Sequence, residues 1–491
     1  MISFFRRISV RLNQLCSKER MDQIHLGYII SFVVFVTLHK LIPYCVYVPR
    51  MVDSFLYSTF AICGALLVAY DFLTGRIPLT SRITLCMLAF LLVCCASTLY
   101  NFQFGVVSNI KTIVWTAIHL FILFASSRGK SQKQVFHEMT LVFTPFTVIW
   151  LVGIVSSLAL FITQTGGYIT LADWSVTEYG FMQERLFGAF TDPNVAGVLS
   201  LVSIGISVSC MYGKRGRLRK AYHILNIFCC VLYAILAGSR TTQLAGTIAL
   251  CIVLTLYFFQ RMDRKQQKGL IKRILCVACS AVISAAILFS NNYIHRALAY
   301  MPSVYSEMTS KSEIHKPLRP VKIDREDVGE DRDFSNQRFA IWSDALALFS
   351  KSPILGTSPR NHLAYAEKYS PAGVINQKQY SIHNGYLAVL VTTGVVGAAV
   401  FLLLIFYCLQ TLYRSFFAKS SKTENSRYLP LLFIAILLAT SAFPMMGIFF
   451  GNSISEVAFW LVMGYLFTIV PGQFDEPPLF LKKRLRSSEN K

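Results

Sequence analysis

Apolar runs of about 20 residues recur along almost the whole chain, and they leave few possible folds. A run of this length crosses roughly 30 Å of hydrocarbon as an α-helix, which satisfies its own backbone hydrogen bonds. The sequence therefore predicts an all-α polytopic membrane protein with about twelve transmembrane helices in one bundle. The runs cover residues 27–48, 52–72, 82–100, 107–125, 139–163, 194–212, 221–237, 241–259, 274–290, 386–412, 428–447 and 452–470.

The composition agrees with this class and excludes a soluble one. Of the 491 residues, 54% are hydrophobic and only 15% are charged, whereas soluble domains carry nearer a quarter of charged residues. The net charge of +22 would suggest nucleic acid in a soluble protein. Here the excess lies in short loops, so it indicates topology and attraction to anionic lipid headgroups. Membrane lipids, and no nucleic acid, are the predicted partners.

Lysine and arginine are concentrated in alternate loops, which predicts the topology. The basic loops are 76–82, 128–133, 214–220, 261–273 and 414–427. Because cytoplasmic loops carry the excess of basic residues, both termini are predicted to be cytoplasmic. The chain then divides into a cytoplasmic segment 1–26, a bundle of about nine spans at 27–290, an extracytoplasmic loop at 291–385, about three spans at 386–470, and a cytoplasmic tail at 471–491.

The long loop contains a predicted amphipathic helix from Arg338 to Phe349. Arg338 and Trp342 lie one turn apart and are expected on one face. We expect this face, with Phe339, Leu346 and Phe349, to pack on the protein or on the membrane surface. Arg338 would then point toward whatever the helix covers.

Three further extracytoplasmic features could carry chemistry. Asp192-Pro193-Asn194 is typical of a helix start, and Arg185 before it could join the helix N-terminus in facing an anion. Arg240 lies in the turn 238–242 and is either an anchor at the membrane surface or a functional group. His383-Asn384 precedes a span, where histidine is either a packed residue or a base.

Together these loops place three arginines and one histidine at the same membrane face. Arginine suits bidentate contacts with phosphate. Because no ATP is present outside the membrane, a phosphate-bearing substrate must arrive already activated, as in a lipid diphosphate-linked sugar. Asp331-Arg332-Asp333 is formally a metal-binding DxD, but the acidic run around it is typical of a solvated loop. The sequence contains no HExxH or P-loop, so no metal and no cofactor are predicted.

The residues resemble the O-antigen ligase and polymerase superfamily of bacterial membrane glycosyltransferases. The resemblance spans about 185–400. Its motifs are Arg185 to Asn194, Gly238-Ser239-Arg240-Thr241, Asn336-Gln337-Arg338 with Trp342, Pro353 to Gly356, and His383-Asn384-Gly385 followed by Gly394 and Gly397.

The resemblance implies transfer of a glycan from an undecaprenyl diphosphate-linked oligosaccharide, without a metal ion, at the outer face of the bacterial cytoplasmic membrane. By matching, Arg185, Arg240 and Arg338 would bind the diphosphate and His383 would activate the acceptor hydroxyl. Asn194, Trp342 and Asn384 would support them. A flippase and a chain-length regulator are candidate partners.

Three functions remain open. A polymerase extends the lipid-linked repeat and is favoured as the broader class. A ligase moves the glycan to lipid A core. A flippase or transporter of the same lipid-linked glycan also suits twelve spans, but the chain lacks a visible internal repeat, and charges are scarce within its spans.

Overall fold

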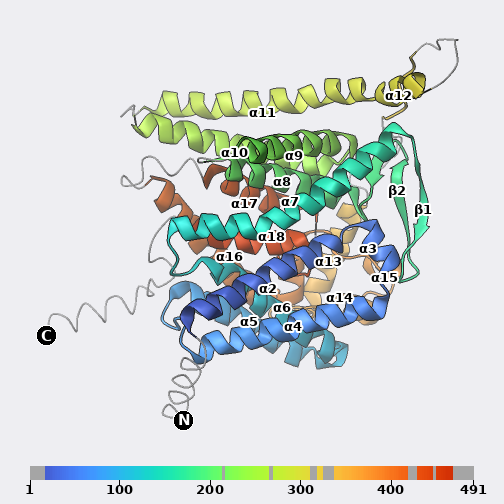
Figure 1. Ribbon diagram of the computed structural model, residues 1–491. Helices are drawn as coiled ribbons and strands as arrows, with labels where there is room; N and C mark the ends of the chain where they lie inside the picture. Colours follow the sequence, from blue (N-terminus) through green and yellow to red (C-terminus); the bar gives the residue numbers. More distant parts are fainter. Residues whose placement is uncertain are drawn as a thin grey trace.

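The chain forms a bundle of long helices with a small sheet and short helices gathered at one end (Figure 1). The computed structural model describes residues 17–212, 216–264, 269–309, 318–323, 337–417, 428–445 and 449–467. Over these residues the secondary structure is almost entirely α-helical, as the apolar runs predicted.

Every predicted run contains a helix. Ten helical segments are long and apolar enough to cross a membrane within the described part of the chain. The last two runs form the shorter apolar helices α17 (Leu429–Ser441) and α18 (Ile454–Phe467). The long helices are α2 (Lys18–Leu38), α4 (Arg50–Leu73), α5 (Arg82–Tyr100), α6 (Val106–Ile118) with the turns that follow it to Ser127, α7 (Gln132–Ile162), α8 (Pro193–Met211), α9 (Arg217–Leu236), α10 (Arg240–Arg264), α11 (Leu270–Leu298) and α16 (Gly385–Phe417).

The first run, predicted as one span over 27–48, is divided. Helix α2 starts earlier and ends at Leu38, and a separate short helix α3 (Ile42–Tyr47) follows. Pro43 lies in the first turn of α3, where its missing N–H and its ring prevent a helix from running on through residue 39. Leu41 is extended instead and forms a β-bridge with Phe190. The break therefore ties the start of the bundle to the 164–193 loop.

That loop holds an antiparallel sheet, which the all-α prediction did not include. Strand β2 (Val176–Met182) lies between β1 (Gly166–Thr170) and β3 (Arg185–Gly188). Gln183 and Glu184 join β2 to β3 with φ of 50° and 52°, as expected for a two-residue hairpin turn. The sheet places Arg185 on β3, which packs against α7, α8 and α9.

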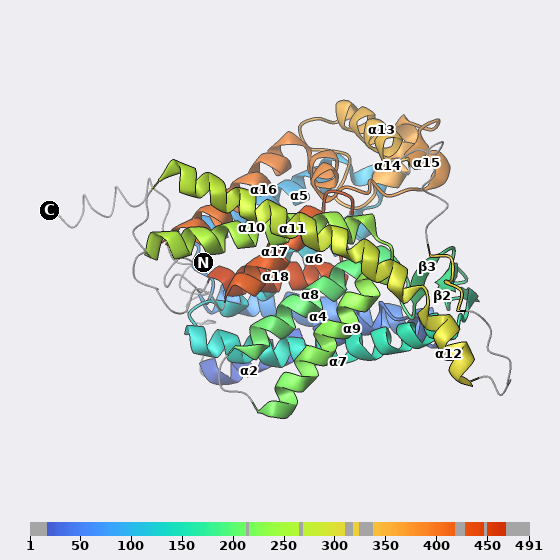
Figure 2. The ribbon, with the colours of Figure 1, turned by 90° about the horizontal axis from the view of Figure 1, so that it is seen from above.

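The long loop folds onto the same end of the bundle. It contains α12 (Met301–Thr309), α13 (Arg338–Lys351), α14 (His362–Tyr369) and α15 (Val374–Lys378). The last three lie together beside α16 (Figure 2). They share a small hydrophobic core with the start of α16, in which Leu348 and Ile382 are fully buried.

The predicted amphipathic helix exists, and its predicted face packs on the protein in part: Trp342 and Phe349 pack against the small core, while the most buried side chains lie on another stripe. Ile341, Ala345 and Leu348 are buried, whereas Phe339 is 65% exposed and Leu346 is 48% exposed. Helix α13 carries two apolar stripes, and the stripe with the small Ala345 allows the closer approach to its neighbours. Trp342 lies beside the buried stripe and packs against that core.

A break in α16 receives the loop that follows α13. Gly394 has φ 70° and interrupts the helix. The peptide groups around the break bond to this loop: Val395 N–H donates to Pro353 O (2.8 Å), and Thr357 N–H donates to Val391 O (2.9 Å). Gly356 also has positive φ, and a Cβ there would collide with the Thr392 backbone. The glycines of the sequence motif therefore join α13 rigidly to α16.

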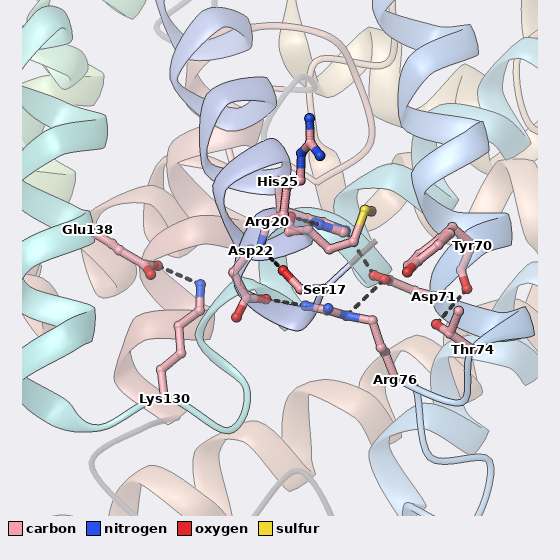
Figure 3. Close-up of polar contacts among 11 residues, drawn as sticks. Ser17, Arg20, Asp22, His25, Tyr70, Asp71, Thr74, Arg76, Lys130 and Glu138 are labelled. Carbon is pink, nitrogen blue, oxygen red and sulfur yellow. Dashed lines mark hydrogen bonds and ion pairs between the residues drawn. The ribbon is translucent and has the colours of Figure 1, made fainter. Parts of the chain in front are cut away.

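A polar network at the other end of the bundle joins α2 to α4 (Figure 3). The buried Asp71 carboxylate lies 3.0 Å from His25 Nε2 and 3.2 Å from Arg76 Nε, and Arg76 also pairs with Asp22. A buried carboxylate requires such partners. This network fixes the first two spans far from the sheet and from α13.

We predict that Gly394→Ala destabilises the protein by about 2 kcal/mol. Alanine is strained at positive φ, and its Cβ would collide with the Ile354 carbonyl. The midpoint of thermal unfolding in detergent measures the effect. Gly27→Ala is the matched control, because Gly27 lies inside α2 with open space around it. Equal midpoints for the two variants would contradict the prediction.

Candidate functional site

Arg185 joins three elements at the end of the bundle. Its Nε donates to the carbonyl of Ala237 (2.7 Å), and one Nη donates to Asn194 Oδ1 (2.6 Å). The guanidinium also lies over the ring of Phe187, 5.6 Å from its centroid, and the residue is only 9% exposed. Strand β3, the start of α8 and the turn between α9 and α10 therefore meet at this side chain, and Asn194 orients it.

The predicted helix start at Asp192 is confirmed. The Asp192 carboxylate accepts from the N–H groups of Asn194 (2.8 Å) and Val195 (3.4 Å), and Pro193 occupies the first turn of α8. The Thr242 hydroxyl donates to the carbonyl of Asn194 at 3.5 Å. The turn that carries Arg240, the first residue of α10, is thereby held against the N-terminus of α8.

Arg338 brings the long loop to the same place. It is the half-buried first residue of α13, after Gln337 at φ 65°. Burial and the positive charge of Arg240 lower the pKa of Arg338, while the negative charge of Asp192 raises it. Two guanidinium groups from distant segments are thus close enough to disfavour each other's charge. Such a pair of cations is suited to binding an anion.

His383 lies next to this pair. Its φ is 51°, in the left-handed region that non-glycine residues seldom adopt. Ile382 before it is fully buried, and Asn384 after it caps α16 by accepting from the Leu387 N–H at 3.0 Å. Both neighbours are therefore fixed, and they hold the His383 backbone in this conformation.

The surroundings of His383 keep its imidazole neutral. Burial and the charge of Arg338 lower the pKa of His383, and Asp192 raises it. The unprotonated ring is therefore the main form at neutral pH and can accept a proton. The ring of Tyr380 lies edge-on to it, with 6.1 Å between centroids.

Trp342 attaches α13 to the ends of the spans. Its ring meets Phe443, just beyond α17, at 88° with 5.9 Å between centroids. Phe443 also lies against Tyr386 on α16. Trp342 therefore positions Arg338 relative to His383, through packing rather than through a polar contact.

The sequence analysis missed two features of the site. One is the effect of the Asp192 charge on Arg338 and His383, and the other is the ring contact between Tyr380 and His383. Asp192 was considered only as a helix cap, because no local sequence pattern links it to Arg338 or His383. Asn336, from the motif Asn336-Gln337-Arg338, and the Asp331-Arg332-Asp333 motif lie outside the described residues. Within the described ranges, no group of three or more His, Cys, Asp or Glu side chains could hold a metal ion.

A model of the family described as O-Antigen ligase matches residues 225–402. The chain contains an O-antigen ligase family domain. The matched region includes five predicted site residues, whereas Arg185 and Asn194 precede it; the five are Arg240, Arg338, Trp342, His383 and Asn384. No match is found among curated proteins. The match over residues 225–402 indicates a membrane enzyme of the glycosyltransferase type and does not separate polymerases from ligases.

We predict that Asp192→Asn moves the acidic limb of the pH–rate profile to lower pH, by roughly half a pH unit. Protonation of His383 would remove the base as pH falls. The substitution removes the negative charge that raises its pKa, so the neutral form persists to lower pH. Asparagine caps helices as well as aspartate does, so α8 keeps its N-terminus. The measurement is kcat/KM as a function of pH.

Asp173→Asn is the control for this prediction. Asp173 is exposed in the same extramembrane loop, where it accepts a hydrogen bond from Ser175. Its loss should leave the acidic limb in place. A limb that stays unchanged in Asp192→Asn, or moves to higher pH, would exclude His383 as the titrating base.

Proposed function

We propose that the chain transfers a glycan from an undecaprenyl diphosphate carrier to an acceptor sugar hydroxyl, without a metal ion, and that it is a polysaccharide polymerase. The proposed site lies on the extracytoplasmic face of the bacterial cytoplasmic membrane, with both termini in the cytoplasm. The observation that carries the proposal is the convergence of Arg185, Arg240 and Arg338 beside a neutral histidine, at one end of the bundle.

The proposed reaction uses these groups in one displacement. The acceptor oxygen attacks the anomeric carbon of the donor sugar while the bond from this carbon to the diphosphate oxygen breaks. His383 takes the proton of the acceptor hydroxyl. The three guanidinium groups stabilise the negative charge that develops on the leaving diphosphate. The protonated imidazole then releases its proton to solvent.

The local electrostatics support this division of roles. Arg240 and Arg338 disfavour each other's charge in the free protein, so a diphosphate placed between them relieves that repulsion. Burial and the charge of Arg338 lower the pKa of His383, which keeps its imidazole unprotonated before the acceptor arrives. Binding the anion raises that pKa again, so proton transfer becomes more favourable when the donor is present.

Polymerase is favoured over ligase as the broader of the two family activities. The ligase alternative transfers the glycan to lipid A core. A flippase and a chain-length regulator are the proposed partners of a polymerase. The alternative from another class is a flippase for the lipid-linked glycan.

Purified protein in liposomes with lipid-linked repeat units tests the function. Longer lipid-linked glycans on gel analysis are expected for a polymerase. If glycan appears only on added lipid A core, the protein is a ligase. If units cross the bilayer without lengthening, it is a flippase. The expected lengthening should persist in excess chelator, and its loss would overturn the metal-free reaction.

We predict that Arg→Lys at 240 or 338 lowers kcat by roughly 100-fold or more. Lysine keeps the charge but lacks the planar fork that binds two phosphate oxygens. Arg50→Lys is the matched control, because Arg50 is an exposed arginine at the start of α4, at the same end of the bundle. Near-normal activity of the 240 and 338 variants would argue against diphosphate clamping.

A further inference from the structure

A second polar cavity lies apart from the arginine cluster. It has a volume of about 560 Å³ and lies between α4 and α6. Tyr57 and Ile62 line it from α4, Lys111 and Trp115 line it from α6, and Arg360 closes it from the loop before α14. None of these residues belongs to the site described above.

Two cations face this cavity. Among the described residues, neither the Lys111 nor the Arg360 side chain has a hydrogen bond or an ion pair. The Arg360 backbone is fixed, because its N–H donates to the buried Asn109 side chain of α6 at 2.9 Å. Asn361 next to it bonds to the carbonyls of Phe104 and Gly105. The loop therefore holds Arg360 on the helix that carries Lys111.

A histidine lies deeper in the same cavity. His119 is fully buried, and neither ring nitrogen has a hydrogen-bond partner within the described structure. It lies at the start of a π-helical turn, residues His119–Leu123, a distortion that is frequent at functional sites. A buried imidazole without partners is costly unless a ligand supplies them.

The cavity opens toward the lipid side of the bundle. Ile62 lines it and is 62% exposed, and Val107 and Ile110 nearby on α6 are 68% and 51% exposed. These residues lie in segments that are long and apolar enough to span a membrane. Lysine in such a segment usually marks a ligand or ion path. A ligand that enters here comes from the membrane and carries a negative charge.

A smaller cavity of about 50 Å³ extends toward His383. It shares Thr112, Thr116 and Phe450 with the larger cavity, and it also reaches Gly385, the residue after Asn384. The two cavities are thus adjacent, and the smaller one reaches the start of α16.

We propose that the cavity between α4 and α6 binds a phosphate-bearing lipid, with its phosphate between Lys111 and Arg360. Guanidinium and ammonium groups supply the charged contacts, and the apolar part of the lipid lies along the exposed wall at Ile62. This lipid is the carrier of the acceptor glycan, an assignment that rests on the proposed function. The acceptor glycan then reaches His383 past the start of α16.

Native mass spectrometry of the full chain in detergent tests the binding, with geranylgeranyl monophosphate as the probe. Two lipids per chain are expected for the wild type, one at each cation cluster. The variant with both Lys111→Gln and Arg360→Gln should bind one lipid, with at least roughly tenfold weaker uptake of the second. Lys351→Gln, which removes an exposed lysine at the end of α13, is the control and should bind two.

Two further measurements distinguish a lipid phosphate from a free phosphate, and this binding site from the proposed catalytic site. Arg240→Gln should lose the other lipid and keep the one at Lys111 and Arg360, whatever the outcome of the activity assay. Unchanged uptake in the double variant would overturn the proposal. If inorganic diphosphate displaces the Lys111-dependent lipid at equal concentration, the site recognises a free phosphate, and the lipid assignment fails.

Discussion

The arrangement of the site depends on backbone hydrogen bonds between the break in α16 and the loop after α13. A helix interrupted inside a membrane leaves peptide groups without partners, and water is absent to satisfy them. The loop supplies those partners at Val391, Thr392, Val395 and Val396. The same hydrogen bonds therefore satisfy the peptide groups at the break in α16 and fix the loop after α13. Together with the small core around Leu348 and Ile382, this contact places Arg338 and His383 in one frame.

The same contact explains why the loop can bring charge to the end of the bundle. Arg338 and Arg240 disfavour each other's charge, and burial adds to the cost. The small core around Leu348 and Ile382, with the ring contact of Trp342 to Phe443, holds α13 in place despite this repulsion. Packing energy thus keeps the cation cluster together before an anion arrives. Preorganised charge of this kind needs no rearrangement when a substrate binds.

Much of the bundle could be predicted from the sequence because helix length and hydrophobicity are local properties. The errors arose where a single residue or a distant partner decided the structure. Pro43 divided the first run, and the Gly-containing strands of the 164–193 loop were too short and too exposed to show a clear alternation. On α13, the choice between two apolar stripes depended on what α14, α15 and α16 presented to it.

The site residues also divide into those that local sequence indicates and those that depend on distant partners. The positions of Arg185, Arg240, Arg338 and His383 could be predicted because each stands out against an apolar chain at the ends of spans. Their roles in the reaction remain predictions. The influence of Asp192 on Arg338 and His383 could not be predicted, because those residues follow it by more than 140 positions. Only the folded arrangement brings these charges close enough to interact.

Asp192 also gives a physical reason why a cation-rich site contains a carboxylate at all. With no anion bound, Asp192 offsets part of the repulsion between Arg240 and Arg338, and it keeps the pKa of His383 from falling further. Its hydrogen bonds to the α8 N-terminus hold it in place, so it cannot swing into the space of an incoming anion. A fixed carboxylate at this distance stabilises the empty site without closing it.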